Sequence, residues 1–291
     1  MDLTITASYT DLYQIAMGQA YFLNGKRDLH ATFDYFFRKA PGGGGYTVFA
    51  GLADALEMLH GLHFSAADME YLASLGFDAQ YLEHLAQLRF RGTVHGVREG
   101  DAIFPTEPVL RVSGNIIEVQ LVETLLLNVL NFQSLIATKA ARIRSVAGSA
   151  ILSEFGMRRA PGLGSVWGSR AAVVGGFDST SNLAAARRYG LRAEGTMAHS
   201  FIQLHDDELT AFRKFVAANP DRATLLVDTY DTLASGVPNA ITVGHEMAAR
   251  GQRLRAIRLD SGDLTFLSRR ARAMLDAAGL KDVKIAASNQ L

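Results

Sequence analysis

Cysteine is absent from the 291-residue chain, and its absence removes several kinds of chemistry at once. Without a thiol the chain has no disulfide framework, no thiolate zinc site and no cysteine nucleophile. The sequence also lacks a GxxxxGK[ST] segment and an HExxH segment, which excludes a P-loop and a zinc site of that spacing. Of the side chains that remain, the imidazole of histidine is the best soft nucleophile.

An excess of charge is also missing, because 29 basic residues balance 29 acidic ones. The chain therefore has no overall field to draw it onto nucleic acid or an anionic membrane, and an anionic ligand needs a local basic cluster. The most apolar segment, 116–136, carries polar residues that include Glu118, Glu123, Asn128, Asn131 and Gln133, which favours a buried helix over a membrane span. The first ten residues lack the basic and apolar regions of a signal peptide, so we expect a cytoplasmic protein.

The length predicts two domains of ordinary size, with one large α/β barrel as the alternative. The first half mixes helix and strand without a regular order. Helices are expected at 11–22 with Thr10 as cap, from 52 onward, at 66–75 and 79–88, and as one helix or a pair over 118–147; strands are expected at 31–38 and 46–50 and within 91–112.

The second half repeats one unit, an apolar extended run followed in most cases by a helical stretch. Strands alternating with helices predict a parallel sheet, whose site lies at the carboxyl ends of the strands. The expected strands are 150–153, 172–176, 193–197, 223–227, 254–259 and 283–287, and polar residues follow each of them. The chain stops directly after the sixth strand, so we expect the natural protein to be longer.

Three groups of residues at these strand ends could carry chemistry. Phe155 could stack on a flat ring while Arg158 or Arg159 clamps a phosphate or carboxylate, although a core phenylalanine beside solvated arginines gives the same pattern. His199 is a candidate nucleophile because of its place at a strand end, although most lone histidines are structural. Its spacing from His205 does not suit zinc.

The third group consists of carboxylates in the segments DTYD and LDSGD. Asp228 and Asp231, with Asp260 and Asp263, provide hard oxygen ligands that suit Mg²⁺ bound to substrate phosphates. Capping of the helices that follow is the alternative, since aspartate directly before a helix is expected on that ground alone.

A basic cluster lies in the helix expected over 118–147. Helical spacing puts Lys139 and Arg142 on one face, which could meet phosphate or could be solvated. The glycine run at 42–45 lacks the strand before it and the helix after it that a nucleotide loop needs, so we interpret it as a flexible turn.

Taken together, these motifs resemble the nicotinate phosphoribosyltransferase family, close relatives of nicotinamide phosphoribosyltransferase. The resemblance covers essentially the whole chain. It rests on TDLYQIAMGQAYF at 10–22, FDYFFRKAPGGGGYTVFAGL at 33–52, LNFQSLIATKAAR at 130–142, EFGMRR at 154–159, GGFDSTSN at 175–182, GTMAHSF at 195–201, VDTYDT at 227–232 and IRLDSGDL at 257–264, all in order.

The resemblance implies an α+β domain at 1–148 and an irregular α/β barrel of the type II phosphoribosyltransferase kind at 149–291, in a homodimer whose active sites are shared between subunits. It implies that nicotinate and phosphoribosyl pyrophosphate give nicotinate mononucleotide and pyrophosphate. ATP, acting with Mg²⁺, is implied as a co-substrate that is hydrolysed through a phosphohistidine. No nucleic-acid or membrane partner is expected.

The resemblance also implies a role for individual residues. His199 matches the phosphorylated histidine, and Phe155 with Tyr13 of the partner subunit matches the aromatic pair around the pyridine ring. Arg258 matches an arginine near the pyridine substituent, with Asp178, Ser179 and Thr180 beside it. Arg158 and the partner's Arg38 match phosphate contacts, to which we add Lys139 and Arg142. Asp228 and Asp260 match carboxylates near the ribose, and Asp260 is also the expected metal ligand.

Three alternatives stay open. Asp178 would favour nicotinamide over nicotinate unless a hydroxyl or an arginine offsets its charge. The family's glycine-rich phosphate-binding loops lie past the sixth strand, so a chain that ended at Leu291 would be a dimer-forming remnant without activity. Quinolinate phosphoribosyltransferase shares the barrel plan, but its two substrate carboxylates need more cationic residues.

Overall fold

The computed structural model describes residues 5–289, which divide by their contacts into two compact units. The first unit runs to Glu194 and the second begins at Gly195. The division after residue 148 that the sequence pattern suggests differs from this one and stays a prediction. Each unit is described by itself.

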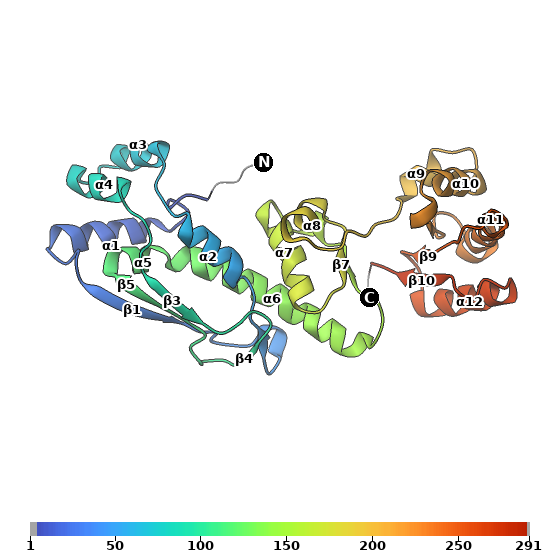
Figure 1. Cartoon of the computed structure of the whole chain (residues 1–291), viewed down its shortest axis with the longest axis horizontal. Helices are drawn as coiled ribbons and strands as arrows, with labels where there is room; N and C mark the ends of the chain where they lie inside the picture. The colour runs from blue at the N-terminus through green and yellow to red at the C-terminus, as the bar shows by residue number, and fades with distance from the viewer. Residues whose placement is uncertain (1–4, 290–291) are drawn as a thin grey trace. The chain divides into compact units, whose positions relative to one another are not determined.

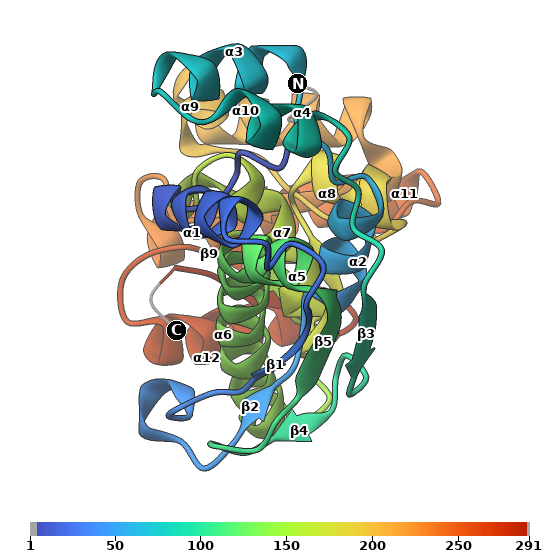
Figure 2. The same ribbon diagram turned by 90° about the vertical axis from the view of Figure 1, so that its left-hand side faces the viewer.

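An antiparallel sheet with the strand order β1-β5-β3 forms one part of the first unit. It consists of β1 (His30–Tyr35), β5 (Leu110–Asn115) and β3 (Thr93–Gly96), with Phe33 opposite Val112. The helix α5 (Ile116–Leu121) packs against β1 and β5, and α1 (Leu12–Leu23) packs on α5 (Figure 2). A separate pair, β2 (Thr47–Val48) and β4 (Ala102–Ile103), is also antiparallel.

Some helices of the first unit begin where a short polar side chain satisfies free N–H groups of the first turn. Ser65 and Asp68 form a capping box at the start of α3, and Asp78 caps α4. Thr10 was the expected cap of α1, but Asp11 holds the N-cap position and the Thr10 hydroxyl donates to the Leu121 carbonyl (3.1 Å). Besides α1 and α5, the helices of this unit are α2 (Leu52–His60), α3 (Ala66–Ser74), α4 (Ala79–Ala86), α6 (Glu123–Ala147), α7 (Leu163–Val174) and α8 (Leu183–Tyr189).

The segment expected as one helix or a pair over 118–147 is the pair α5 and α6. Val129 and Leu130 of α6 are fully buried, which confirms a buried helix in this apolar stretch. Within residues 5–289, no helix combines the length and the hydropathy that crossing a membrane requires.

Two of the six strands expected in the second half of the chain are wrong. Residues 172–174 complete α7, because Ala171 and Ala172 continue its buried face. The helix ends at Gly175, where a Cβ would lie 2.3 Å from the Ala137 carbonyl oxygen of α6. Of 193–197, only Ala193 forms a bridge, to Thr180. The parallel pair in this region is β6 (Ser153–Glu154) with β7 (Ser179–Thr180).

The second unit confirms the alternation of strands and helices. Its parallel sheet has the order β10-β9-β8, made of β8 (Thr224–Leu226), β9 (Ala256–Leu259) and β10 (Lys284–Ala287). Leu225, Leu226, Ile257 and Leu259 are fully buried in its core. The helices around the sheet (Figure 1) are α9 (His199–Gln203), α10 (Glu208–Ala218), α11 (Val237–Ala249) and α12 (Leu264–Ala277).

Candidate active site

His199 is the first residue of α9 and lies beside the carboxyl ends of β8 and β9. Its Nδ1 is 3.1 Å from the Thr229 hydroxyl, and its Nε2 is 3.7 Å from Oδ2 of Asp260. The side chain is 39% exposed, so a ligand can reach the ring. The structure thus brings His199 and Asp260 together, although the strand expected just before His199 is reduced to a bridge at Ala193.

Asp228 and Asp260 follow neighbouring parallel strands, and each uses one oxygen for the protein. Oδ2 of Asp228 accepts from the Asp260 amide (2.8 Å) and the Ser261 hydroxyl (2.5 Å). Its Oδ1 is buried and has no hydrogen-bond partner in the described part of the chain. A buried carboxylate oxygen without a donor is costly, which suggests that a bound group completes it.

Asp260 directs Oδ1 toward Arg258 Nη2 (2.8 Å) and the Ser288 hydroxyl (2.5 Å). Burial raises the pKa of this carboxyl, but the hydrogen bonds from Ser288 and Arg258 together lower it below the usual range. Asp260 is therefore an anion at neutral pH, with Oδ2 on the side of His199.

Arg258 lies on β9 with its side chain only 13% exposed. Besides Asp260, its guanidinium donates to the Ser288 hydroxyl (2.9 Å), the Thr196 hydroxyl (3.1 Å) and the Met197 carbonyl (3.3 Å). These contacts hold the side chain in one orientation. A substrate carboxylate bound to Arg258 would share the positive charge of the guanidinium with the carboxylate of Asp260.

The capping interpretation holds for the other two aspartates of DTYD and LDSGD. Asp231 accepts from the amides of Leu233 and Ala234 at the helical turn Thr232–Gly236, and Asp263 accepts from the Phe266 amide at the start of α12. Asp228 and Asp260 cap no helix, because their oxygens bind across the strand ends. Capping thus explains one aspartate of each motif and leaves the other for function.

In the first unit, Phe155 and Arg158 follow β6 and are exposed. Asp178 lies just before β7, where it accepts from the Leu152 amide (2.8 Å) and from Arg144 Nη2 (2.6 Å). The Leu152 hydrogen bond and then the Arg144 ion pair lower the pKa of Asp178. Arg144 thus supplies the offsetting arginine that a nicotinate site beside Asp178 requires.

Ser179 and Thr180 are fully buried, and their hydroxyls form hydrogen bonds with side chains of the neighbouring strand β6. Ser179 shares a 2.6 Å hydrogen bond with Ser153, and Thr180 donates to Oε2 of Glu154 (2.7 Å). A direct contact of either hydroxyl with substrate stays a prediction.

The glycine run at 42–45 wraps around Arg142. Nη2 of Arg142 donates to the Pro41 carbonyl (2.7 Å), and a Cβ on Gly44 would lie 1.5 Å from that nitrogen. Gly42 and Gly43 have φ values of 58° and 66°, which side chains rarely adopt. The run is therefore a built loop around Arg142 rather than a merely flexible turn, whereas Lys139 is exposed one helical turn earlier.

Tyr13 and Arg38 are both exposed on the first unit. The Tyr13 hydroxyl donates to Glu123 (3.2 Å), and its ring borders a cavity of about 480 Å³ together with Leu127 and Leu135. Leu135 is 49% exposed, so this cavity opens on a partly apolar surface.

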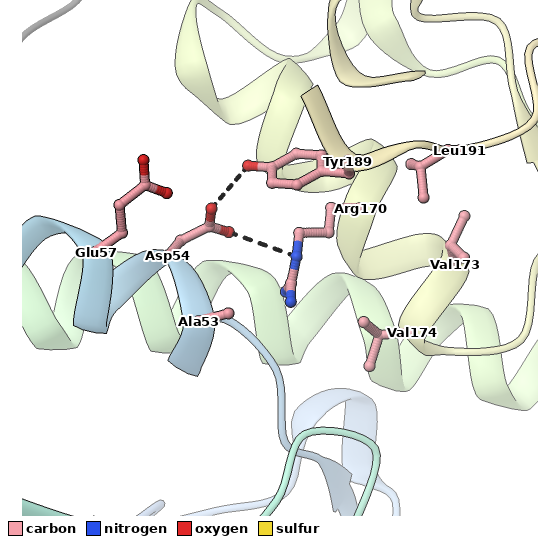
Figure 3. Close-up of a pocket in the computed structure, with 8 residues that line it drawn as sticks. All are labelled: Ala53, Asp54, Glu57, Arg170, Val173, Val174, Tyr189 and Leu191. Carbon is pink, nitrogen blue, oxygen red and sulfur yellow. Dashed lines mark hydrogen bonds and ion pairs between the residues drawn. The ribbon is translucent and has the colours of Figure 1, made fainter. Parts of the chain in front are cut away.

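A different cavity, of about 400 Å³, lies between α2, α7 and the end of α8 (Figure 3). Its polar side chains bind one another: the Tyr189 hydroxyl donates to Asp54 (2.8 Å), and Arg170 Nε is 3.9 Å from the other Asp54 oxygen. Arg170 also pairs with Glu99 (2.6 Å). This network joins helices of the first unit and holds none of the site residues expected from sequence.

Comparison with known proteins decides the family. The model of the nicotinate phosphoribosyltransferase N-terminal domain matches residues 9–131, and that of the nicotinate phosphoribosyltransferase family matches residues 151–282. A crystal structure of human nicotinic acid phosphoribosyltransferase has a TM-score of 0.91 and 34% identity, over 97% of this chain and 68% of that one. The chain belongs to the nicotinate phosphoribosyltransferase family.

Other relatives of this family member agree. The nicotinate phosphoribosyltransferase of Bacillus subtilis is 47% identical over 97% of this chain and 58% of its own length, and pncB2 of Mycobacterium tuberculosis is 45% identical over 99% and 62%. The chain thus spans about 60% of these relatives. Nicotinate-nucleotide pyrophosphorylase of Pyrococcus furiosus has a TM-score of 0.79 and 25% identity, over 98% of this chain and 66% of that one. These neighbours confirm the expected α/β fold class, the type II phosphoribosyltransferase barrel preceded by an α+β domain.

Four polar residues of the chain have a place in these clusters that the sequence pattern does not predict. Thr229 and Ser288 contact His199 and Arg258, while Arg144 and Glu154 hold the residues around β6 and β7. Position at a strand end was a usable signal for Thr229 and Ser288. Arg144 and Glu154 act through partners 34 and 26 residues away, which no local pattern reveals.

Proposed function

We propose that this protein transfers the phosphoribosyl group of phosphoribosyl pyrophosphate to nicotinate, which yields nicotinate mononucleotide and pyrophosphate. The observation that carries the proposal is the pair Asp228 and Asp260, each of which binds protein donors through one carboxylate oxygen. The other oxygen of Asp228 has no hydrogen-bond partner in the described part of the chain, and the other oxygen of Asp260 lies on the side of His199. The family membership and the names of the relatives support the same reaction.

The chemistry of the transfer suits these residues. Displacement of pyrophosphate develops positive charge on the ribosyl carbon, which nearby carboxylates stabilise, and negative charge on the leaving group. Asp228 and Asp260 would provide the carboxylates. No proton acceptor is required, because the pyridine nitrogen attacks with its own lone pair.

Magnesium fits the same pair. Within residues 5–289, no cluster of three or more acidic or histidine side chains could hold a metal ion by itself. Mg²⁺ commonly takes one or two carboxylates and completes its shell with phosphate oxygens and water. Asp260 is the proposed ligand, with the unpartnered Oδ1 of Asp228 nearby in the same cluster. When bound, the ion would neutralise charge on the pyrophosphate.

Recognition of nicotinate is assigned to the aromatic and charged residues that the family resemblance singles out. Phe155, with Tyr13 of the partner subunit, would stack on the pyridine ring, and stacking orients the ring nitrogen. Arg258 would pair with the carboxylate, and the charge of Asp178 is compensated by Arg144. That ion pair argues against a preference for nicotinamide, since Asp178 would otherwise attract an amide.

Phosphate binding is assigned to Arg158, Lys139 and the partner's Arg38. Arg142 is assigned to phosphate binding as well, although one of its nitrogens already donates to the Pro41 carbonyl. Guanidinium groups suit phosphate because their planar N–H groups match its oxygens.

Coupling to ATP is assigned to His199. A ring nitrogen would attack the terminal phosphorus of ATP, ADP would leave, and water would later release phosphate from the ring. Thr229 and Asp260 lie at the two ring nitrogens and would orient the imidazole.

We also propose a homodimer with shared sites and a cytoplasmic location. The exposed Tyr13 and the cavity beside Leu127 and Leu135 support a partner on this surface. A closed two-fold dimer would use the same patch twice.

The experiment is direct synthesis by the natural protein. With nicotinate, phosphoribosyl pyrophosphate, Mg²⁺ and ATP, equal amounts of nicotinate mononucleotide and pyrophosphate should form. Asp228→Asn should reduce the rate by roughly a hundred-fold or more, because the site loses one anion. Absence of the nucleotide product, or full activity in Asp228→Asn, would overturn the proposal.

A further inference from the structure

Glu154 joins three segments of the first unit at the ends of β6 and β7. Its Oε2 accepts from the Ser169 hydroxyl of α7 (2.8 Å) and from the Thr180 hydroxyl of β7 (2.7 Å). Its Oε1 accepts from the Gly156 amide. One carboxylate thus binds a helix, a strand and the first residue of the turn after Phe155.

The turn that Glu154 holds carries the residues proposed to bind the base and phosphate. Phe155 lies between Glu154 and Gly156, and Arg158 is in the 3₁₀ turn Met157–Arg159 that follows. This short turn carries both side chains, so the path of its backbone sets their placement. Control of the backbone at Gly156 therefore controls where the Phe155 ring and the Arg158 guanidinium point.

The carboxylate of Glu154 lies directly against the backbone of Gly156, since a Cβ there would lie 2.7 Å from Oε1. On the other side, Thr180 also accepts from the Asn182 amide (3.0 Å), and Asn182 caps α8. The turn is thereby connected to β7 and to two helices through a single side chain.

We propose that Glu154 is a positioning residue for nicotinate binding, which fixes the turn bearing Phe155 and Arg158 to the strand ends. The inference rests on the proposed function. Glu154 touches no substrate; it acts through the Gly156 amide. Its three donors need both carboxylate oxygens, and the near-isosteric glutamine offers one acceptor oxygen only.

The test is Glu154→Gln in the natural protein. The Michaelis constant for nicotinate should rise about ten-fold, because a charge-assisted hydrogen bond that fixes the turn is lost. The constant for phosphoribosyl pyrophosphate should rise less, because Arg158 is only one of the residues assigned to phosphate. Amide hydrogen exchange across 155–159 should accelerate, and exchange in α12 should not. Ser169→Ala, which removes one donor, should give about a three-fold rise by the same reasoning.

Glu57→Gln is the matched control, because Glu57 belongs to the same unit and makes an exposed ion pair with Arg188. It should leave both Michaelis constants unchanged. The fluorescence of the buried Trp167, the chain's single tryptophan, reports whether each variant folds. If Glu154→Gln does not fold, Ser169→Ala carries the test alone.

Two results would overturn the inference: an unchanged nicotinate constant, or equal rises in both constants, as a general loss of structure would give. Phe155→Ala separates this outcome from failure of the proposed function. If Phe155→Ala weakens nicotinate binding and Glu154→Gln does not, the role of Glu154 is wrong; if neither does, the base site is wrong as well.

Discussion

Replacement of Arg258 by alanine tests the assignment of substrate charge. The guanidinium is nearly buried and is held by Asp260 (2.8 Å) and Ser288 (2.9 Å), so it is oriented before a ligand arrives. Arg258→Ala removes the proposed partner of the nicotinate carboxylate. It also leaves Asp260 with Ser288 and the more distant His199.

The expected rise in the Michaelis constant for nicotinate depends on how far Asp260 already compensates the charge of Arg258. A hydrogen bond between charged groups contributes about 1.5–3 kcal/mol, or roughly ten- to hundred-fold in affinity. Asp260 already takes part of the charge of Arg258, because the two groups are 2.8 Å apart. We therefore expect the lower end of the range, a rise of about ten- to thirty-fold in the Michaelis constant for nicotinate.

Steady-state kinetics with nicotinate and nicotinamide measure this effect. Arg258→Ala should raise the nicotinate constant more than the nicotinamide constant, because the neutral amide has no charge to lose. Arg213→Ala is the control, since Arg213 makes an exposed ion pair with Glu246 in the same unit. An unchanged nicotinate constant, or an equal rise for both bases, would refute the assignment.

Three further predictions concern the same site. His199→Ala should abolish acid-labile phosphate transfer from ATP while the fold is retained. Inactive Tyr13→Ala mixed with inactive His199→Ala should recover about a quarter of the activity in an exchanged dimer population, since half of the dimers are mixed and each regains one complete site. Because folding lowers the pKa of Asp260, its contribution to stability is present above the usual carboxyl range and is lost as pH falls through the folded-state pKa. Calorimetry from about pH 6 to pH 3 should therefore show a steeper loss for the wild type than for Asp260→Asn.

Each of these three predictions has an outcome that would contradict it. Undiminished labelling of His199→Ala would remove this histidine from the mechanism. No recovery of activity, once subunit exchange is demonstrated by mixed labels, would argue against shared sites. Parallel melting curves for the wild type and Asp260→Asn would show that Asp260 is not stabilised as an anion in the folded protein.

The cluster of the second unit was predictable because its logic is local. A buried apolar strand that ends in polar residues places them at one edge of a parallel sheet, and Asp228 and Asp260 do lie together. His199 lies beside Asp260, although only Ala193 of the strand expected before His199 forms a bridge. Spacing could not separate Asp228 from Asp231, because both lie in the segment that follows the same strand. The structure separates them, since only Asp231 reaches the free amides of the next helical turn.

The misread strand at 172–176 shows where local patterns fail. Val173 and Val174 are β-branched and favour strands in isolation, yet packing of α7 on α6 extends the helix through them. The ion pair of Arg144 with Asp178 joins α6 to the approach of β7 and likewise depends on tertiary structure. In the proposed site this ion pair would compensate the charge of Asp178 beside nicotinate.

A competition assay tests most directly whether the protein transfers the phosphoribosyl group to nicotinate in preference to nicotinamide. The natural protein receives equal concentrations of both bases with limiting phosphoribosyl pyrophosphate, and the two mononucleotides are separated by chromatography. Nicotinate mononucleotide should exceed nicotinamide mononucleotide at least ten-fold, as expected for one charge-assisted contact. A predominance of nicotinamide mononucleotide, or no nucleotide product, would contradict this expectation.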